Sequence, residues 1–214
     1  MKRMIAIGMT ILSVGMFSAC STNSNSPKSS NSSSHSKSNT AQHYKYYAKG
    51  KTFYGPKGTL KINKLIGYTL DNNHYFILDI TYKNTTKKEV DASDIMTPNI
   101  EARQLNKDKS QKINLNGSNS ASQYYRDNNN NIDDYNKFNE ITDSASNSLM
   151  PEKELHTLQE FSYKLNNNEN DIELSLSDPD ATSDDTVNPK KNKITIDINS
   201  IQDNSLNLND YSTN

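Results

Sequence analysis

Apolar and polar residues alternate with a period of two along several segments of this chain, which predicts half-buried β-strands. The clearest strand is the run at residues 75–82, because it is apolar on both faces. One face carries Phe76, Leu78, Ile80 and Tyr82, and the other carries Tyr75 and Ile77. A strand with two apolar faces is typical of the middle of a sheet, so this run is the expected core strand.

Weaker alternation predicts further strands on both sides of this run. Residues 60–70 place five apolar side chains at one parity, with Lys64 as the exception: Leu60, Ile62, Ile66, Tyr68 and Leu70. Residues 155–165 are expected to point four apolar side chains inward: Leu155, Phe161, Tyr163 and Leu165. A weaker strand is expected within residues 90–105, around Ile100, Ala102 and Gln104, and shorter alternating runs occur at residues 171–176 and 194–199. No long helical pattern separates the strands, so the prediction is an all-β fold, an antiparallel β-sandwich.

A long polar segment at residues 106–148 interrupts the strand pattern as an insertion. A structureless loop of that length is unusual in a compact domain. Its aromatic and aliphatic residues recur at intervals of three to four positions, which predicts a short helix at residues 133–140, packed on a sheet edge. The rest of the insertion is expected to lack regular structure.

The N-terminal residues have a different character. Lys2 and Arg3 precede an apolar run at residues 4–17, which is shorter than the ~20 residues of a membrane-spanning helix. The run ends at Phe17-Ser18-Ala19-Cys20 and resembles a bacterial lipoprotein signal peptide with its lipobox. The resemblance implies cleavage before Cys20, with Phe17, Ser18 and Ala19 as the cleavage flank, and lipidation of the Cys20 thiol.

The expected plan of the chain follows from these segments. Residues 1–19 are a lipoprotein signal peptide. Residues 20–54 are the lipidated cysteine and a flexible tether, since residues 21–40 are mostly Ser and Asn and cannot bury enough apolar surface to fold. Residues 55–200 are the β domain, and residues 201–214 are a polar tail. The expected location is the extracytoplasmic face of the cell membrane, held by lipid.

Composition narrows the possible partners. Cys20 is the only cysteine, so a lipidated chain has no disulfide and depends on its apolar core. The net charge of −1 becomes −3 when Lys2 and Arg3 are removed, which is not the basic footprint of a nucleic-acid-binding protein. The expected partners are the membrane, through the lipid, and an extracellular protein, peptide or glycan that the sequence does not identify.

The β domain also resembles a known group over residues 58–200. The segment Tyr75-Phe76-Ile77-Leu78-Asp79-Ile80-Thr81-Tyr82-Lys83-Asn84-Thr85-Thr86-Lys87-Lys88 and the later Leu149-Met150-Pro151-Glu152-Lys153-Glu154-Leu155 are similar to the immunoglobulin-like, or telokin-like, domain of Firmicute-type lipoproteins. Glu152 stands where that family usually has Gly. The resemblance implies an immunoglobulin-like sandwich and brings neither catalytic residues nor an established substrate.

Candidate chemistry is sparse. Asp127, Asn129, Asn131 and Asp133 alternate as the oxygen ligands of a calcium loop do. An EF-hand also needs Gly at the sixth position and Glu at the twelfth, which are Ile132 and Phe138 here. These four residues are therefore only weak metal candidates, and neither a metal nor a cofactor is expected.

Catalytic motifs are missing from the sequence. It contains no Gly-x-Ser-x-Gly elbow, no His-Glu-x-x-His and no Gly-rich phosphate loop. His74 and His156 each begin a strand without a pattern that indicates a triad. The sequence therefore predicts a non-enzymatic binding module on the Gram-positive surface. A structural envelope component without a discrete ligand, or an extracellular enzyme or hydrolase inhibitor, remains as the alternative.

Overall fold

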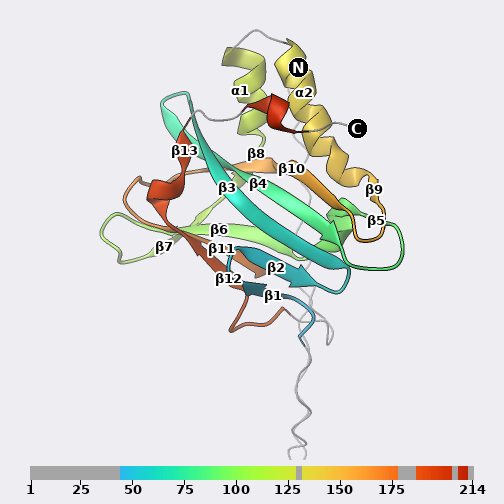
Figure 1. Ribbon diagram of the computed structural model, residues 1–214. Coiled ribbons are helices and arrows are strands. Elements are labelled where there is room, and N and C mark those ends of the chain that lie inside the picture. Colours follow the sequence, from blue (N-terminus) through green and yellow to red (C-terminus); the bar gives the residue numbers. More distant parts are fainter. Residues whose placement is uncertain (1–43, 129–131, 178–186, 204–206, 212–214) are drawn as a thin grey trace, which may run out of the picture. The chain divides into compact units, whose positions relative to one another are not determined.

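A computed structural model describes residues 44–128, 132–177, 187–203 and 207–211. Two sheets and a pair of helices make up most of this part of the chain (Figure 1). The larger sheet has the order β1-β2-β3-β4-β10-β8, all antiparallel, with β13 parallel to β3. Its strands are β1 (Tyr47–Lys49), β2 (Thr52–Gly55), β3 (Gly58–Leu70), β4 (Asn73–Asn84), β10 (Glu154–Lys164), β8 (Gly117–Ser118) and β13 (Gln202–Asp203).

The smaller sheet is antiparallel, with the order β12-β11-β6-β7. Its strands are β12 (Lys193–Ile196), β11 (Ile172–Ser177), β6 (Asn99–Leu105) and β7 (Lys112–Leu115). A further pair joins β5 (Val90–Asp91) to β9 (Ser148–Leu149). The helices are α1 (Ser120–Asn128) and α2 (Ile132–Asp143), with short 3-10 turns η1 (Ala92–Ile95), η2 (Ser144–Ser146), η3 (Ile198–Ser200) and η4 (Leu208–Asp210). The β-rich prediction is confirmed.

Strand β4 lies in the middle of the larger sheet and is buried on both faces, as its sequence predicts. On one face, Phe76, Leu78 and Ile80 join a hydrophobic cluster that both sheets share, with Leu174 of β11 and Ile196 of β12 among its members. This cluster is the core between the two sheets. Burial of each of these side chains contributes roughly 1.5–3 kcal/mol to folding.

The opposite face of the larger sheet carries the helices (Figure 1). Ile77 of β4 and Ile66 of β3 pack there with Phe138 and Ile141 of α2 in a second hydrophobic cluster. The helix expected at residues 133–140 is therefore present, within Ile132–Asp143, but it packs on the face of the sheet and not on a sheet edge as predicted. The hydroxyl of Thr157 on β10 donates to the Ile141 carbonyl, so the end of α2 is tied to a strand of the sheet.

Two β-bulges change which side chains point inward. In β3 the register shifts between Ile62 and Lys64, so that Leu65 faces the core between the sheets while Ile66 faces the helices. The prediction that Leu60, Ile62, Ile66, Tyr68 and Leu70 share one face is therefore wrong. An extra residue in a strand reverses the side-chain alternation beyond it, and this happens after Asn63.

The second bulge interrupts β10 between Leu158 and Ser162. It turns Phe161 outward, leaving this side chain 44% exposed, so the prediction that Phe161 points inward is also wrong. Tyr163 returns to the core beyond the bulge and stacks on Phe76, with ring centroids 5.3 Å apart.

The folded region extends beyond the segment expected from sequence. Residues 47–54, assigned above to the tether, form β1 and most of β2, where Phe53 is fully buried. In the expected tail, Leu208 and Tyr211 are buried in the second cluster. The expected insertion supplies α1, which was not predicted, and β7, which is a strand of the smaller sheet. Isolated apolar residues in polar surroundings carry too little periodicity to reveal these elements.

Gly58 is the glycine with the least room for a side chain. A Cβ there would lie 1.9 Å from the Lys83 carbonyl oxygen on the neighbouring strand. We expect Gly58→Ala to lower the free energy of unfolding by at least ~3 kcal/mol, because backbone must move. Gly50→Ala is the matched control. Its Cβ meets open space, and its φ of +61° should cost only about 1 kcal/mol. Urea unfolding followed by circular dichroism compares the two variants, and equal losses would contradict this account.

Candidate functional site

A carboxylate is buried at the centre of the larger sheet, on the face that carries the helices. Asp79 of β4 is only 2% exposed. Its Oδ1 accepts hydrogen bonds from Asn63 Nδ2 at 2.8 Å and His156 Nε2 at 2.7 Å, and its Oδ2 accepts one from the Tyr211 hydroxyl at 2.9 Å. Lys64 Nζ lies 4.0 Å from Oδ2. We call these five residues the Asp79 cluster.

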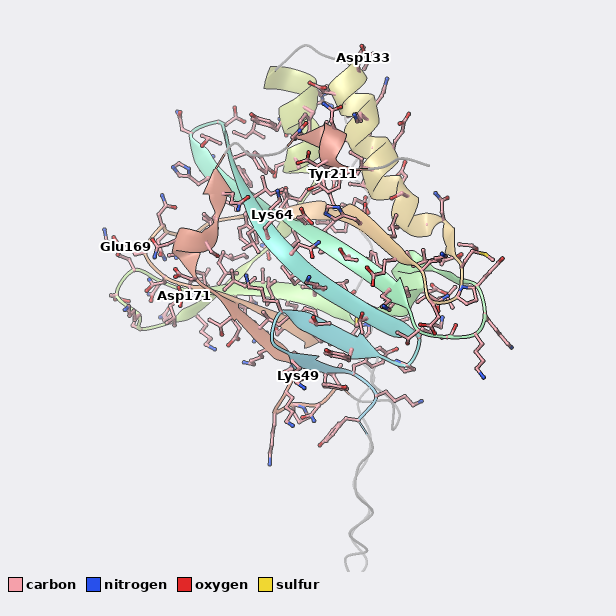
Figure 2. The ribbon with its side chains drawn as sticks, viewed as in Figure 1. Lys49, Lys64, Asp133, Glu169, Asp171 and Tyr211 are labelled. Atoms are coloured by element: carbon pink, nitrogen blue, oxygen red, sulfur yellow. The ribbon has the colours of Figure 1, made fainter. Side chains whose placement is uncertain are left out.

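Three separate elements meet at this carboxylate. The β3 bulge brings Asn63 and Lys64 to the same side of the sheet as Asp79. His156 comes from β10, and Tyr211 follows η4 near the end of the described chain. Figure 2 labels Lys64 and Tyr211, which both lie on the side of the larger sheet that carries the helices. A buried carboxylate needs such donors, because an uncompensated charge is very costly to remove from water.

One side of the Asp79 cluster opens to solvent. A shallow hollow of about 630 Å³ lies over it, and Thr81, Glu154 and Gln202 complete its lining. The His156 side chain is 43% exposed there. An aspartate that orients a histidine is one half of a general-base arrangement. The other half would be a nucleophilic hydroxyl beside the histidine. Ser118, Ser120 and Ser162 do not supply it, because they form hydrogen bonds with one another and with Tyr68.

Sequence reasoning missed the Asp79 cluster. His156 had no informative neighbours in the sequence, and its partner Asp79 lies 77 positions away. One signal was available, namely an acidic residue inside the mainly apolar run at 75–82. A charged residue at such a position is rarely buried without a partner.

A second hollow, of about 240 Å³, lies where α1, α2, β3 and residues 207–209 meet. We call it the tyrosine hollow, because Tyr68, Tyr124 and Tyr125 line it. The ring centroids of Tyr68 and Tyr124 are 5.1 Å apart, and those of Tyr124 and Tyr125 are 5.4 Å apart. Tyr68 and Tyr125 are buried, whereas Tyr124 is partly exposed. The accessible aromatic surface of the hollow therefore comes from Tyr124.

Tyr68 is fixed by a buried network of hydroxyl groups. Its hydroxyl donates to Ser162 Oγ at 2.7 Å and lies 2.8 Å from Ser120 Oγ, and the two serine oxygens are 2.8 Å apart. Burial raises the pKa of Tyr68 to about 12, although these serine hydrogen bonds act in the opposite direction. The network joins β3, β10 and the first residue of α1, so it fixes one wall of the hollow.

Tyr125 differs from Tyr68 because its buried hydroxyl has no hydrogen-bond partner among the described residues. Burial raises its pKa, and the neighbouring Tyr124 and Asp134 raise it further. The ring stacks on Phe138 with centroids 5.2 Å apart, so packing rather than hydrogen bonding holds it. Buried polar groups without a partner are uncommon in folded proteins, which makes this wall of the hollow unusual.

The remaining lining of the tyrosine hollow is mixed. Ala121 and Leu208 supply apolar surface. Asp134 and Lys137 of α2 contribute one charge of each sign, and Asn207 and Asn209 add amides from the C-terminal segment. Lys137 Nζ donates to Asn209 Oδ1, which ties this segment to α2. The hollow thus combines an aromatic wall with several hydrogen-bonding groups.

The site residues expected from sequence are only partly visible. Cys20 and its flank Phe17, Ser18 and Ala19 lie outside the described residues, as do Asn129 and Asn131. Asp127 falls in the last turn of α1 and Asp133 in the first turn of α2. Figure 2 shows Asp133 at the outer tip of the helix pair. Within the described ranges, no group of three or more His, Cys, Asp or Glu side chains could hold a metal ion. No described helix is long and apolar enough to cross a membrane.

Comparisons with known proteins give a likeness of fold. No protein-family model and no curated protein matches the chain. A solved structure from Staphylococcus aureus subsp. aureus NCTC 8325, described as a "putative lipoprotein", superposes with a TM-score of 0.51 at 15% identity, covering 74% of this chain and 95% of that one. An NMR structure of an Enterococcus faecalis protein gives a TM-score of 0.39 at 14% identity, covering 73% and 97% of the two chains. The staphylococcal protein thus shares the general fold.

The Asp79 cluster makes a prediction about stability and pH. Tyr211→Phe removes a donor to a buried charge and should lower the free energy of unfolding by about 2 kcal/mol at pH 8. Burial and the adjacent Asp79 carboxylate raise the pKa of Tyr211. The folded protein therefore holds this proton more tightly than the unfolded chain, whose tyrosines titrate near pH 10. The stabilisation of the folded state by the protonated Tyr211 hydroxyl is therefore complete below pH ~10 and is lost as the pH rises above that value.

The difference in free energy of unfolding between the wild type and Tyr211→Phe should accordingly shrink by roughly 1 kcal/mol between pH 8 and pH 11. Urea unfolding at the two pH values measures this difference. Tyr47→Phe is the control, because the Tyr47 side chain is 37% exposed on β1 and lies outside the cluster. An equal loss in free energy of unfolding for Tyr211→Phe at both pH values would contradict the role of the Tyr211 hydroxyl as a donor to Asp79.

Proposed function

We propose that this chain is a lipid-anchored, non-catalytic binding module of the Gram-positive cell envelope, built on an immunoglobulin-like framework. The observation that carries the proposal is the tyrosine hollow, in which four separate chain segments form one concave site with aromatic and polar lining. Concave sites with an apolar wall and a few converging polar groups are where proteins bind small ligands.

The strand order supports the immunoglobulin-like part. In that fold, one sheet has the order A-B-E-D, and the other has C-F-G, with C′ added beside C in variable-type domains. Strands β3-β4-β10-β8 follow the first order, and β7-β6-β11-β12 follow C′-C-F-G. The helix pair is then an addition between the strands that correspond to D and E.

The location rests on the N-terminal sequence. The lipobox-like run ending at Cys20, followed by a Ser- and Asn-rich segment, fits a tethered protein. Two acyl chains on one cysteine give firm membrane binding, at about 0.8 kcal/mol for each buried CH₂ group. The description of the staphylococcal structure as a lipoprotein agrees with this location.

The hydrogen bonds of the Asp79 cluster favour a binding function over a catalytic one. The carboxylate accepts from three donors and lies near a lysine, which is an arrangement that holds a charge in place. The hydroxyls of Ser120 and Ser162, which would otherwise be candidate nucleophiles, both form hydrogen bonds with Tyr68. The function therefore depends on the hollow rather than on the acid–histidine pair.

The anchor is tested by Cys20→Ser. We expect the wild-type protein to fractionate with membranes and to gain the mass of a diacylglyceryl group, with cleavage before Cys20. The variant should lose this lipid and leave the membrane fraction on carbonate washing. A Ser21→Ala variant controls for changes near the cleavage site. A membrane-extracted wild-type protein that lacks the mass of the diacylglyceryl group would disprove the lipid anchor.

The binding site is tested with isolated Gram-positive cell walls. We expect detergent-extracted wild-type protein to sediment with walls, and Tyr124→Ala to reduce the bound fraction at least tenfold. Tyr47→Ala is the matched control, since Tyr47 is a partly exposed tyrosine on β1 and lies outside the hollow. Equal sedimentation of all three proteins would show that the tyrosine hollow is not the binding site.

A further inference from the structure

We propose that the tyrosine hollow binds a single N-acetylhexosamine ring of a surface polysaccharide. The inference rests on the proposed function and specifies the ligand of the same site. It follows from four properties of the hollow, namely its aromatic surface, its charge balance, its size and the contacts between its rings.

Tyr124 provides a flat surface for a sugar ring. It is the partly exposed member of the three tyrosines, and its orientation is fixed by contacts with Tyr68 and Tyr125. The face of an aromatic ring carries partial negative charge, so it attracts the polarised C–H groups on the apolar face of a pyranose. Because neighbouring rings already hold Tyr124, little side-chain entropy is lost when a ligand packs on it.

The polar groups of the hollow suit an uncharged ligand with many hydroxyl groups. Asp134 and Lys137 contribute opposite charges, and Lys137 is already hydrogen-bonded to Asn209. A charged ligand would therefore meet one like charge beside each opposite one. Asn207 Nδ2 donates to Asp210 Oδ1, and Asn207 Oδ1 accepts from the Asn209 N–H, so one amide N–H and one oxygen lone pair remain for sugar hydroxyls and an acetamide group.

The size and the apolar lining favour one ring with an acetamide group. A volume of about 240 Å³ equals that of about eight water molecules, enough for one ring but not for a chain of them. Ala121 and Leu208 provide apolar surface beside the aromatic wall, where the methyl of an acetamide can pack. An unsubstituted hexose would leave that surface without a partner.

The contacts between the rings argue against an ammonium ligand. A cation needs the open face of a ring within about 6 Å of the ring centroid. Here the three tyrosines pack against one another, with centroids 5.1 and 5.4 Å apart, so they form a continuous wall rather than a cage around an empty centre. One accessible ring face is enough for a pyranose to stack on, whereas recognition of an ammonium group typically uses a cage of several ring faces.

The test uses the detergent-extracted full-length protein and three soluble trisaccharides in saturation-transfer NMR. Triacetylchitotriose carries acetamide groups, chitosan trimer lacks the acetyl groups, and maltotriose lacks the nitrogen. We expect a Kd on the order of 1 mM for triacetylchitotriose, as for a ligand of about fifteen seated atoms, and binding at least fivefold weaker for the other two. Tyr124→Ala should weaken binding at least tenfold, and Tyr47→Ala should leave it unchanged.

Amide shift changes in the unmodified protein provide a measurement that does not depend on the folding of a variant. On addition of triacetylchitotriose they should be confined to the residues that line the hollow, which are Gly67, Tyr68, Ala121, Tyr124, Tyr125, Asp134, Lys137 and residues 207–209. Shift changes elsewhere, no binding, or equal binding of maltotriose would each overturn the inference.

Competition on cell walls separates this inference from the proposed function. If the wall glycan is the source of the ring, triacetylchitotriose should release the bound protein, and so should peptide-free glycan strands. Tyr124-dependent wall binding that none of these sugars displaces would overturn the sugar assignment and leave the binding module in place. If Tyr124→Ala binds cell walls as well as the wild-type protein does, both the proposed binding site and the sugar assignment are wrong.

Discussion

Burial of β4 on both faces is the constraint on which the rest of the described fold depends. One face of this strand forms the core between the two sheets, and the other face requires a cover of its own. The helix pair supplies that cover through Phe138 and Ile141. Because Ile77 and Leu78 point in opposite directions from adjacent positions, the sheet core and the helical layer cannot form independently of one another.

Asp79 adds a polar requirement to this apolar strand. Its charge lies on the helix-bearing face of the sheet, where Asn63, His156 and Tyr211 reach it as donors. Each donor comes from a different part of the chain, so the carboxylate links the β3 bulge, β10 and the C-terminal segment. The same C-terminal segment forms a wall of the tyrosine hollow through Asn207 and Leu208. The shape of the tyrosine hollow therefore depends in part on Asp79, which holds the same C-terminal segment through Tyr211.

The sequence predicts the strands well where alternation is long and fails where one extra residue interrupts it. The central position of residues 75–82 follows directly from two apolar faces. The bulge at residues 159–161 leaves no mark in the sequence pattern, because its position depends on its three-dimensional surroundings. The bulge at Asn63 does leave a sign in the sequence, because Lys64 is the single exception to the apolar parity at residues 60–70. Helix α2 was predicted from its spacing, whereas the shorter α1 has too few apolar residues to show a period.

The candidate site was less accessible to sequence reasoning than the fold. The tyrosines of the insertion stood out, but their meeting with Tyr68 and residues 207–209 depends on long-range packing. Residues 207–211 also leave the ribosome after every other described part of the chain. This last described segment thus supplies both one donor to Asp79 and one wall of the hollow. A chain that is still being made can pair β3 with β4, but it cannot yet present a complete binding site, so the site becomes available only once synthesis has passed Tyr211.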